Sequence, residues 1–198
     1  LMPILTAPCC ARNARGKPMV NLLPLEEGER INAILPIKQF DDDHYVFMAT
    51  SFGTVKKTPL SAFANPRGKG IIAAELDAGD FLIGVAITDG KHDVMLFSDA
   101  GKAVRFAEDE VRPMGRTAAG VRGMKLQKGQ RVMSLLTASD ESLSVLTATE
   151  NGYGKRTLVS EYTRHGRGTQ GIIAIDCSER NGKLIGAQLV AAEDAHAP

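Results

Sequence analysis

The chain of 198 residues has few aromatic residues and few cysteines. Tryptophan is absent, aromatic residues make up 5% of the chain, and there are three cysteines. Cys9 and Cys10 are adjacent, Cys177 stands alone, and no two cysteines have the CxxC spacing. An odd number of cysteines without such a pair argues against a disulfide framework and against a cysteine zinc site. This usage is typical of a protein in a reducing cytoplasm.

Long hydrophobic runs and a large net charge are also missing. No apolar run approaches the roughly 20 residues that a membrane helix needs. The first ten residues, LMPILTAPCC, are apolar but have no basic segment before them, so they do not resemble a signal peptide. The 24 basic and 23 acidic residues give a net charge of +1, which alone does not indicate a nucleic-acid partner. We therefore expect a cytoplasmic protein that does not bind a membrane.

The sequence lacks the signatures of catalysis, cofactor binding and metal binding. Its four histidines are scattered and do not have the spacing of metal ligands. Three aspartates at residues 41–43 are typical of a solvated acidic turn, which fits them better than a magnesium site. No GxGxxG fingerprint or GxxxxGK[ST] loop opens a helix, and no nucleophile elbow surrounds a serine. We expect no catalytic residue, metal or cofactor in this chain.

The chain does contain many glycines and a repeat of about 50 residues. Residues 47–70 begin with an apolar run, a turn glycine and a basic pair, and end in a basic, glycine-rich patch. Residues 94–120 and 145–171 show a similar order, and the turn glycines of the three copies lie 48 and 51 residues apart. A fixed period of this length indicates a propeller-like or solenoid architecture.

Short apolar strands separated by glycine turns predict an all-β fold. The first half of each repeat reads as a hairpin, and Asn151 followed by Gly152 predicts a type I′ turn. The second half reads as another hairpin, for example residues 71–76 pairing with residues 81–87. Four short strands in each unit are typical of a propeller blade. A βα solenoid fits poorly because no segment shows a convincing apolar period of 3.6 residues.

The repeats organise most of the chain into one domain. Complete repeats cover residues 45–89, 93–138 and 144–190, and residues 12–38 look like the second half of a further repeat. Residues 1–11 match nothing else in the chain, and we expect them to be partly disordered. Closed propellers usually have four or more blades. We therefore expect an incomplete ring, an open arc, or a ring closed by strand exchange between blades.

Positive charge is segregated within each repeat. Residues 45–74 and 111–139 contain no acidic residue, and residues 151–175 contain one. Acidic residues collect at other phases of the repeat, and the main exception is the acidic trio at residues 108–110. Equivalent positions of stacked repeats fall on equivalent sides of an assembly. The basic residues are therefore predicted to form a band along one rim.

Such a band predicts binding to duplex DNA, because the local field holds the phosphates even when the total charge is small. Contacts to phosphates are not sequence-specific, and they weaken steeply with salt. The alternative for a single basic pair is a set of solvated turn side chains, which does not explain four phased copies. The predicted phosphate contacts are Arg12, Arg15, Lys17, Lys56, Lys57, Arg67, Lys69, Arg105, Arg112, Arg116, Arg122, Lys125, Lys155, Arg156, Arg164 and Arg167.

Four passages resemble the C-terminal domain of the DNA gyrase A protein. They are ARGKPMVNLLPLEEGERI (residues 14–31), VFMATSFGTVKKT (46–58), EVRPMGRTAAGVRGMKL (110–126) and TATENGYGKRT (147–157). The resemblance runs from Arg12 to about Val190. It implies a β-pinwheel, a propeller-like ring of four-stranded blades that exchange strands, whose basic perimeter binds and wraps duplex DNA.

The resemblance also implies a parent enzyme. In a gyrase heterotetramer, the partners would be the gyrase B protein and the catalytic core of the gyrase A protein, and ATP and Mg²⁺ would be used elsewhere in the complex. The implied activity is that of a type II topoisomerase that introduces negative supercoils into chromosomal DNA. Two features depart from the family pattern. No copy of the family's basic, glycine-rich box precedes Arg12, and the family ring has more blades than this chain has repeats.

Two other interpretations remain open at this point. The chain could be the equivalent domain of the topoisomerase IV A protein, although the passage ARGKPMVNLLPL favours gyrase. It could also be a propeller-like interaction module whose basic rim binds an acidic protein.

Overall fold

The computed structural model describes residue 15 and residues 31–66 and 70–191, and the described part is built from β-strands. The strands are β1 (Tyr45–Thr50), β2 (Thr54–Pro59), β3 (Leu82–Thr88), β4 (Asp93–Ser98), β5 (Lys102–Ala107), β6 (Val121–Arg122), β7 (Val132–Ala138), β8 (Ser144–Thr149), β9 (Gly154–Leu158), β10 (Ile172–Ile173) and β11 (Leu184–Val190). Three short 3₁₀ helices are η2 (Leu60–Phe63), η3 (Glu108–Glu110) and η4 (Val159–Glu161). Within these residues, no helix is long and apolar enough to cross a membrane. The predicted all-β fold is confirmed.

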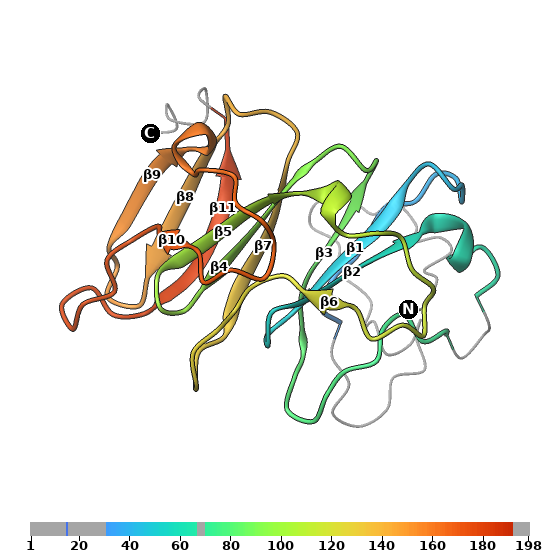
Figure 1. Ribbon diagram of the computed structural model, residues 1–198, viewed down its shortest axis with the longest axis horizontal. Helices are drawn as coiled ribbons and strands as arrows, with labels where there is room; N and C mark the ends of the chain where they lie inside the picture. The colour runs from blue at the N-terminus through green and yellow to red at the C-terminus, as the bar shows by residue number, and fades with distance from the viewer. Residues whose placement is uncertain (1–14, 16–30, 67–69, 192–198) are drawn as a thin grey trace.

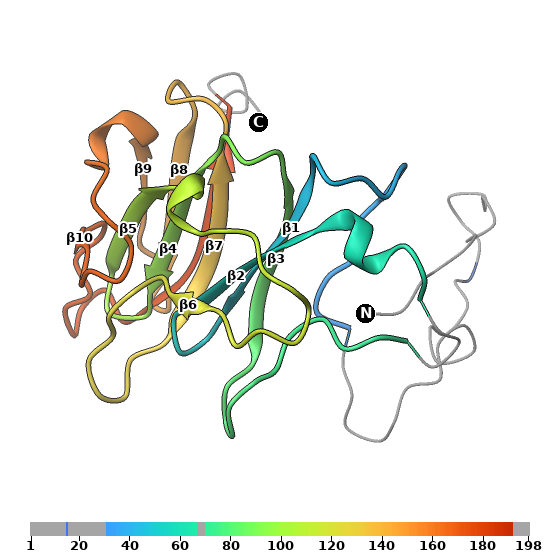
Figure 2. The same cartoon turned by 45° about the vertical axis from the view of Figure 1, so that its right-hand side comes forward.

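The strands form three antiparallel sheets that fan out side by side (Figures 1 and 2). The first blade has the strand order β3-β1-β2-β6, the second β10-β5-β4-β7, and the third β11-β8-β9. In each blade the last strand of the repeat, β3, β7 or β11, lies at the inner edge, and β7 contacts both β3 and β11. The blades are therefore arranged around a common centre, as in a propeller.

The predicted second hairpin of each repeat is wrong. The short strand β6 pairs with β2 of the preceding blade, with Val121 opposite Val55, and β10 pairs in the same way with β5. The second and third blades thus each give one strand to the blade before them, as the expected strand exchange requires. Residues 71–76 occupy the corresponding position after Gly70 but are not assigned to a strand. The described segment before β1 contains no strand with which they could pair.

The tight turns depend on glycines with positive φ. Gly53, Gly101 and Gly152 have φ of 84°, 74° and 80°, and each N–H bonds to the carbonyl three residues before it at 3.0 Å. A type I′ turn needs positive φ at two successive residues. No described residue other than glycine has positive φ, so the prediction of a type I′ turn at Asn151 is wrong. All three hairpins instead use a three-residue loop that ends in a left-handed glycine.

The hydrophobic core lies mainly between the blades. Phe47 and Val55 of the first blade pack in one cluster with Val94 and Phe106 of the second, and a comparable cluster joins the second and third blades. Strand β4 is buried along its whole length because both faces of its sheet are covered, whereas burial partly alternates along β8. Leu146 of β8 is 44% exposed. The third blade is therefore covered on one face only.

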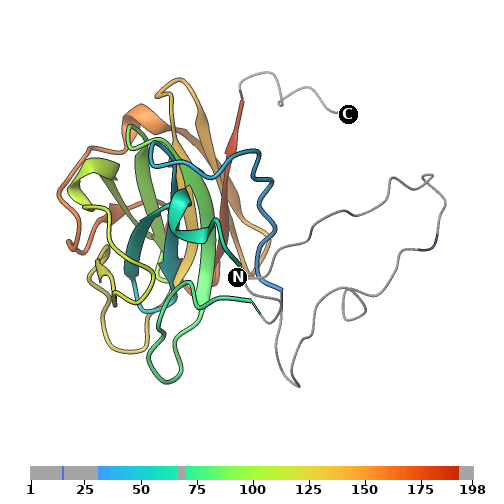
Figure 3. The ribbon, with the colours of Figure 1, turned by 90° about the vertical axis from the view of Figure 1, so that its right-hand side faces the viewer.

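The far face of the first blade is covered by the segment that precedes it. Leu35 and Ile37 pack with Ile71 against the buried side chains of Val46 and Phe63. Residues 31–40 run beside the sheets without joining them (Figure 3). The two ends of the row of blades therefore differ, since only the first is covered by another part of the described chain.

Candidate nucleic-acid interface

Two equivalent connections cross the outer strands and carry half of the described candidate residues. After η3, the backbone N–H of Met114 bonds to the carbonyl of Lys57 at 2.8 Å. After η4, the backbone N–H of His165 bonds to the carbonyl of Arg105, also at 2.8 Å. Each connection is thus tied to the outer strand of the preceding blade at the same repeat position. Side chains that point away from the strands face solvent on the outside of successive blades.

The structure exposes about half of the predicted contact residues. The exposed ones are Arg15, Arg112, Arg122, Lys125, Lys155, Arg156, Arg164 and Arg167, and Arg116 is half-buried. Four others, Arg12, Lys17, Arg67 and Lys69, lie outside the described residues. The arrangement can attract phosphates, because exposed cations can neutralise them, although Arg164 and Arg167 also have partners within the protein.

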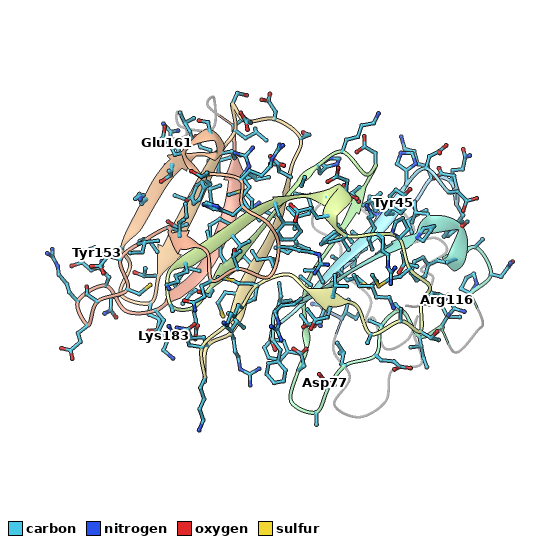
Figure 4. The ribbon with its side chains drawn as sticks, viewed as in Figure 1. Tyr45, Asp77, Arg116, Tyr153, Glu161 and Lys183 are labelled. Atoms are coloured by element: carbon cyan, nitrogen blue, oxygen red, sulfur yellow. The ribbon has the colours of Figure 1, made fainter. Side chains whose placement is uncertain are left out.

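Arg116 and Arg167 join successive connections as well as presenting charge. Arg116 Nη1 donates to the carbonyl of Ile72 at 3.0 Å, and Arg167 Nη1 donates to the carbonyl of Arg122 at 3.2 Å. The two arginines and their two acceptors occupy equivalent repeat positions. Figure 4 shows Arg116 on the connection that crosses the first blade. These side chains hold the outer layer together and leave only part of their donor capacity for a ligand.

Lys57 and Arg105 do not lie on the exposed rim, and the prediction that they do is wrong. Their exposed fractions are 4% and 3%. Lys57 Nζ donates to the carbonyl of Glu108 at 3.2 Å, and Arg105 Nη1 donates to the equivalent carbonyl of Val159 at 3.0 Å. Each cation thus binds the start of the 3₁₀ helix of the next blade. The connection that this contact holds covers the side chain and excludes it from a ligand outside.

Arg105 is the centre of a larger ionic cluster. Its Nε donates to Asp93 Oδ2 at 2.8 Å, its Nη2 also binds Asp93 and Glu141, and Arg164 Nη2 lies 2.8 Å from Asp93 Oδ1. Burial favours the neutral guanidine, but the hydrogen bonds to Glu141 and Asp93 outweigh it and raise the pKa of Arg105. Arg105 therefore stays charged, and the cluster joins the second blade to the third.

Lys56 is also buried, which corrects its predicted place on the rim. Its Nζ donates to the carbonyl of Ala73 at 3.0 Å and to the carbonyl of Arg116. Burial lowers the pKa of Lys56, because removing an ammonium from water disfavours its charged form. The side chain therefore serves to hold two covering segments together.

In the third blade, Lys155 takes the repeat position of Lys56 and Val104. Arg156 takes the position of Lys57 and Arg105. Both are exposed, because within the described chain no strand or connection covers the outer edge of β9. Their exposure thus comes from their place at the end of the row and not from their residue types.

The acidic residues follow the repeat for a local structural reason. Asp41, Asp89 and Asp140 occupy equivalent positions before β1, β4 and β8. Each accepts a backbone N–H two residues later, at 3.1, 3.0 and 2.8 Å respectively. These are Asx turns, in which a side chain caps the backbone of a tight loop. Hydrogen bonds lower the pKa of all three carboxyl groups, and for Asp41 the largest contribution comes from the side chain of His44.

The acidic trio of η3, which interrupts a basic stretch of sequence, is explained by its contacts. Glu108 is 1% exposed and lies 3.7 Å from Lys57 Nζ through Oε1. Glu110 Oε2 accepts the backbone N–H of Arg167 at 3.0 Å. Both acids therefore join blades.

One cationic side chain of the seam between the first two blades was missed by the sequence reasoning. Arg131 stacks on Phe52 and Phe81, with its guanidinium carbon 4.9 and 5.5 Å from the two ring centroids. Arg131 also lines a shallow groove of about 380 Å³ together with Phe52 and Leu126. The sequence signal that could have identified this contact is that Phe52 and Phe81 both lie beside turns of the same repeat.

The described residues offer one group that could hold a metal ion, formed by Asp89, His92 and Glu108. None of the described histidines lies in a recognisable catalytic arrangement with a serine or cysteine. The exposed cations can bind anions by charge and hydrogen bonding.

A family model and the curated relatives that match this chain indicate the same family. The family model described as "DNA gyrase C-terminal domain, beta-propeller" matches residues 8–38, 44–89, 92–139 and 144–191. The DNA gyrase A protein of Klebsiella oxytoca is 56% identical over 186 residues, which cover 94% of this chain and 21% of the relative. The chain thus spans about a fifth of the length of the curated relatives that it matches.

Two solved structures show the same architecture. The crystal structure of the C-terminal domain of DNA topoisomerase IV aligns with a TM-score of 0.83 at 28% identity, over 88% of this chain and 55% of that one. The structure of a DNA gyrase A C-terminal domain aligns with a TM-score of 0.78 at 27% identity, over 90% of this chain and 59% of that one.

Proposed function

Because the chain belongs to the family of DNA gyrase C-terminal domains, we propose that it binds and bends duplex DNA along its outer surface without reading sequence. This proposal rests on the observation that equivalent connections hold exposed cations on the outside of successive blades. Phosphate contacts from such cations position DNA and carry no base information. The proposed contacts are Arg112, Arg122, Lys125, Arg164 and the outward part of Arg116 and Arg167.

The energetics support a bent duplex on this surface. Bending a site of 20–30 base pairs by 40–90° costs roughly 1–6 kcal/mol. Contacts spread over several blades can offset this cost, because each neutralised phosphate releases condensed counterions. Blades that fan around a centre present their cations along a curved path, which a bent duplex follows better than a straight one.

In the whole protein, we propose that this domain presents DNA to the strand-passage machinery of a gyrase. The partners would be the catalytic core of the gyrase A protein and the gyrase B protein, in which ATP drives negative supercoiling. ATP and Mg²⁺ would then act outside this chain, and the complex would be associated with the bacterial chromosome in the cytoplasm. The names of the relatives support this proposal.

A mobility-shift titration tests DNA binding. We expect the chain to bind a duplex of roughly 100 base pairs at low salt, with affinity falling steeply as salt rises. Replacing Arg112, Arg122 and Lys125 by glutamine should weaken binding and reduce the logarithmic salt slope by about 3. A matched control replaces Lys91, an exposed lysine in the loop before β4, by glutamine. No shift at low salt, or equal losses in both variants, would contradict the proposal.

The equivalent role in topoisomerase IV is the second candidate, because the higher TM-score belongs to that enzyme's domain. The two functions differ in the product that the whole enzyme makes. A gyrase A protein carrying this domain should introduce negative supercoils into relaxed plasmid when it is combined with the gyrase B protein and ATP. Decatenation and relaxation without negative supercoiling would favour the topoisomerase IV role.

A further inference from the structure

We propose that Asp89, His92 and Glu108 form a binding site for one Zn²⁺ ion in the second blade. Their ligand atoms all lie within 4.8 Å of one another. Asp89 and His92 come from the loop before β4, and Glu108 comes from η3. The backbone already holds these segments together, since the N–H of Glu108 donates to the carbonyl of His92 at 2.9 Å.

The spacing of the ligand atoms suits a tetrahedral ion. His92 Nδ1 lies 3.0 Å from Asp89 Oδ1 and 3.7 Å from Glu108 Oε2. With zinc bonds of 2.0–2.1 Å, neighbouring ligands of a tetrahedral site lie roughly 3.3 Å apart. The two separations fall on either side of this value, so movements of a few tenths of an ångström would admit the ion. Water would complete a site with three protein ligands.

The ring nitrogen of His92 supports a ligand between the two carboxylates. Nδ1 is buried and faces Asp89 Oδ1 at 3.0 Å and Glu108 Oε2 at 3.7 Å, and within the described part of the chain neither contact has the alignment of a good hydrogen bond. A buried polar atom without a hydrogen bond is costly, and each such atom in a native structure calls for an explanation. A cation bound between His92, Asp89 and Glu108 would give Nδ1 a well-aligned partner.

The surroundings of Glu108 orient its carboxylate for this role. Oε1 accepts a hydrogen bond from Thr88 Oγ1 at 2.6 Å and lies 3.7 Å from Lys57 Nζ. Oε2 faces His92, whose backbone N–H donates to it at 3.3 Å. Such outer contacts are typical of metal ligands, because they fix the orientation of the carboxylate. Lys57 approaches the oxygen that the ion would not use, and an imidazole beside carboxylates is a suitable set for zinc.

The chain contains a matched site that lacks the third ligand. His44 and Asp41 are the repeat equivalents of His92 and Asp89, and their Nδ1–Oδ1 distance is 2.9 Å. Leu60 takes the position of Glu108 in that blade. Zinc binding at His44 and Asp41 therefore measures the affinity of a histidine and an aspartate without the buried glutamate.

Isothermal titration of the chain with zinc chloride tests the site. Cys9, Cys10 and Cys177 are first replaced by serine, so that thiolates do not compete. We expect one zinc ion per chain, with binding at least tenfold weaker in His92→Ala and in Asp89→Asn, and unchanged in His44→Ala. Cobalt substitution should give the strong visible absorption of a tetrahedral site in the parent protein and not in His92→Ala.

Two outcomes would overturn the proposal. One is no binding of zinc by the parent chain at micromolar concentrations, and the other is equal binding by the parent and by Asp89→Asn. Asp89 is exposed, so Asp89→Asn provides the test even if His92→Ala fails to fold. Circular dichroism of each variant confirms that a loss of binding is not a loss of fold. If His44→Ala binds zinc as tightly as the parent chain and His92→Ala does not bind it, the ion lies in the second blade.

Discussion

Lys57, Arg105 and Arg156 occupy one repeat position in three successive blades, yet only Arg156 is exposed. Lys57 and Arg105 each bind the 3₁₀ helix of the following blade. Within the described chain, nothing covers β9 in that way. The same kind of side chain is thus an internal clamp in one place and a surface cation in another. The presence of a following blade makes the difference.

The two clamps also differ from each other. Lys57 faces a buried carboxylate on η3, whereas Arg105 reaches one carbonyl at the start of η4 and one just after it, and takes its carboxylates from Asp93 and Glu141. Arginine can serve more acceptors because its guanidinium has five N–H donors in a plane. The seam between the second and third blades is therefore the more highly connected, and its loss should cost more.

Arg105→Ala should have the largest effect on stability. The substitution leaves the buried carboxylate of Asp93 without its main partner and frees the carbonyls of Val159 and Tyr162. Removing one partner of a buried ion pair typically costs 3–5 kcal/mol, and about 3 kcal/mol is expected here because Arg164 still faces Asp93. Urea unfolding followed by circular dichroism measures the change.

Arg156→Ala is the control for the same position at the end of the row. An exposed arginine without a structural partner should change the free energy of unfolding by no more than about 0.5 kcal/mol. If both variants lost the same stability, burial by a following blade would not explain the contrast between Arg105 and Arg156.

Lys57 and Glu108 should be strongly coupled in a double-mutant cycle. Lys57→Met alone leaves a buried glutamate unpaired, and Glu108→Leu alone leaves a buried ammonium, so each should cost about 2–3 kcal/mol. The double variant should lose less than the sum by at least about 1 kcal/mol, because leucine is the residue at the equivalent position Leu60. Simple additivity in urea unfolding would show that the 3.7 Å contact contributes nothing.

The hairpin glycines extend the comparison to the backbone. A Cβ on Gly101 would lie 2.3 Å from the carbonyl oxygen of Ile175, whereas a Cβ on Gly152 would meet nothing within 4 Å. Both have positive φ, so alanine costs about 1 kcal/mol at either position. Gly101→Ala should cost about 1–2 kcal/mol more, because the short contact is to backbone of the following blade. Equal melting temperatures for the two variants would contradict this.

The sequence was sufficient to predict the first hairpin of each blade, but not the outer strand that comes from the next repeat. Turn glycines at a regular period and alternating apolar residues predicted the first hairpin of each repeat correctly. The pairing of β6 and β10 could not be inferred in the same way, because a two-residue strand has no period of its own. Its partner lies in another repeat, and local patterns do not report contacts of that range.

The sequence predicted which basic residues belong to the candidate site, but not which of them are buried. Charge phasing placed Arg112, Arg122 and Lys125 in basic stretches, and the structure exposes all three. The same phasing included Lys57, and Arg105 was predicted alongside it, since a buried cation and an exposed one have the same sequence signal. Glu108, the acidic partner of Lys57, appeared as an exception to the charge pattern. Only the packing of the next blade shows that this exception is a partner of a buried cation.

The smallest effect should come from the Asx turns, which recur in all three blades whether or not a following blade is present. The backbone N–H of Ser142 lowers the pKa of Asp140, so the folded state binds its proton less tightly than the unfolded state does. This stabilisation is therefore present above the unfolded pKa of about 3.9 and is lost as pH falls through the lower folded pKa. Asp140→Ala should lower the urea midpoint slightly at pH 6, and its difference from the parent should shrink between about pH 4 and 2.5. Asp140→Asn keeps an acceptor without a titrating group, so it should retain more stability than alanine and show no such convergence from the turn itself. A difference between Asp140→Ala and the parent that stays constant down to about pH 2.5 would show that the carboxylate charge does not stabilise this loop.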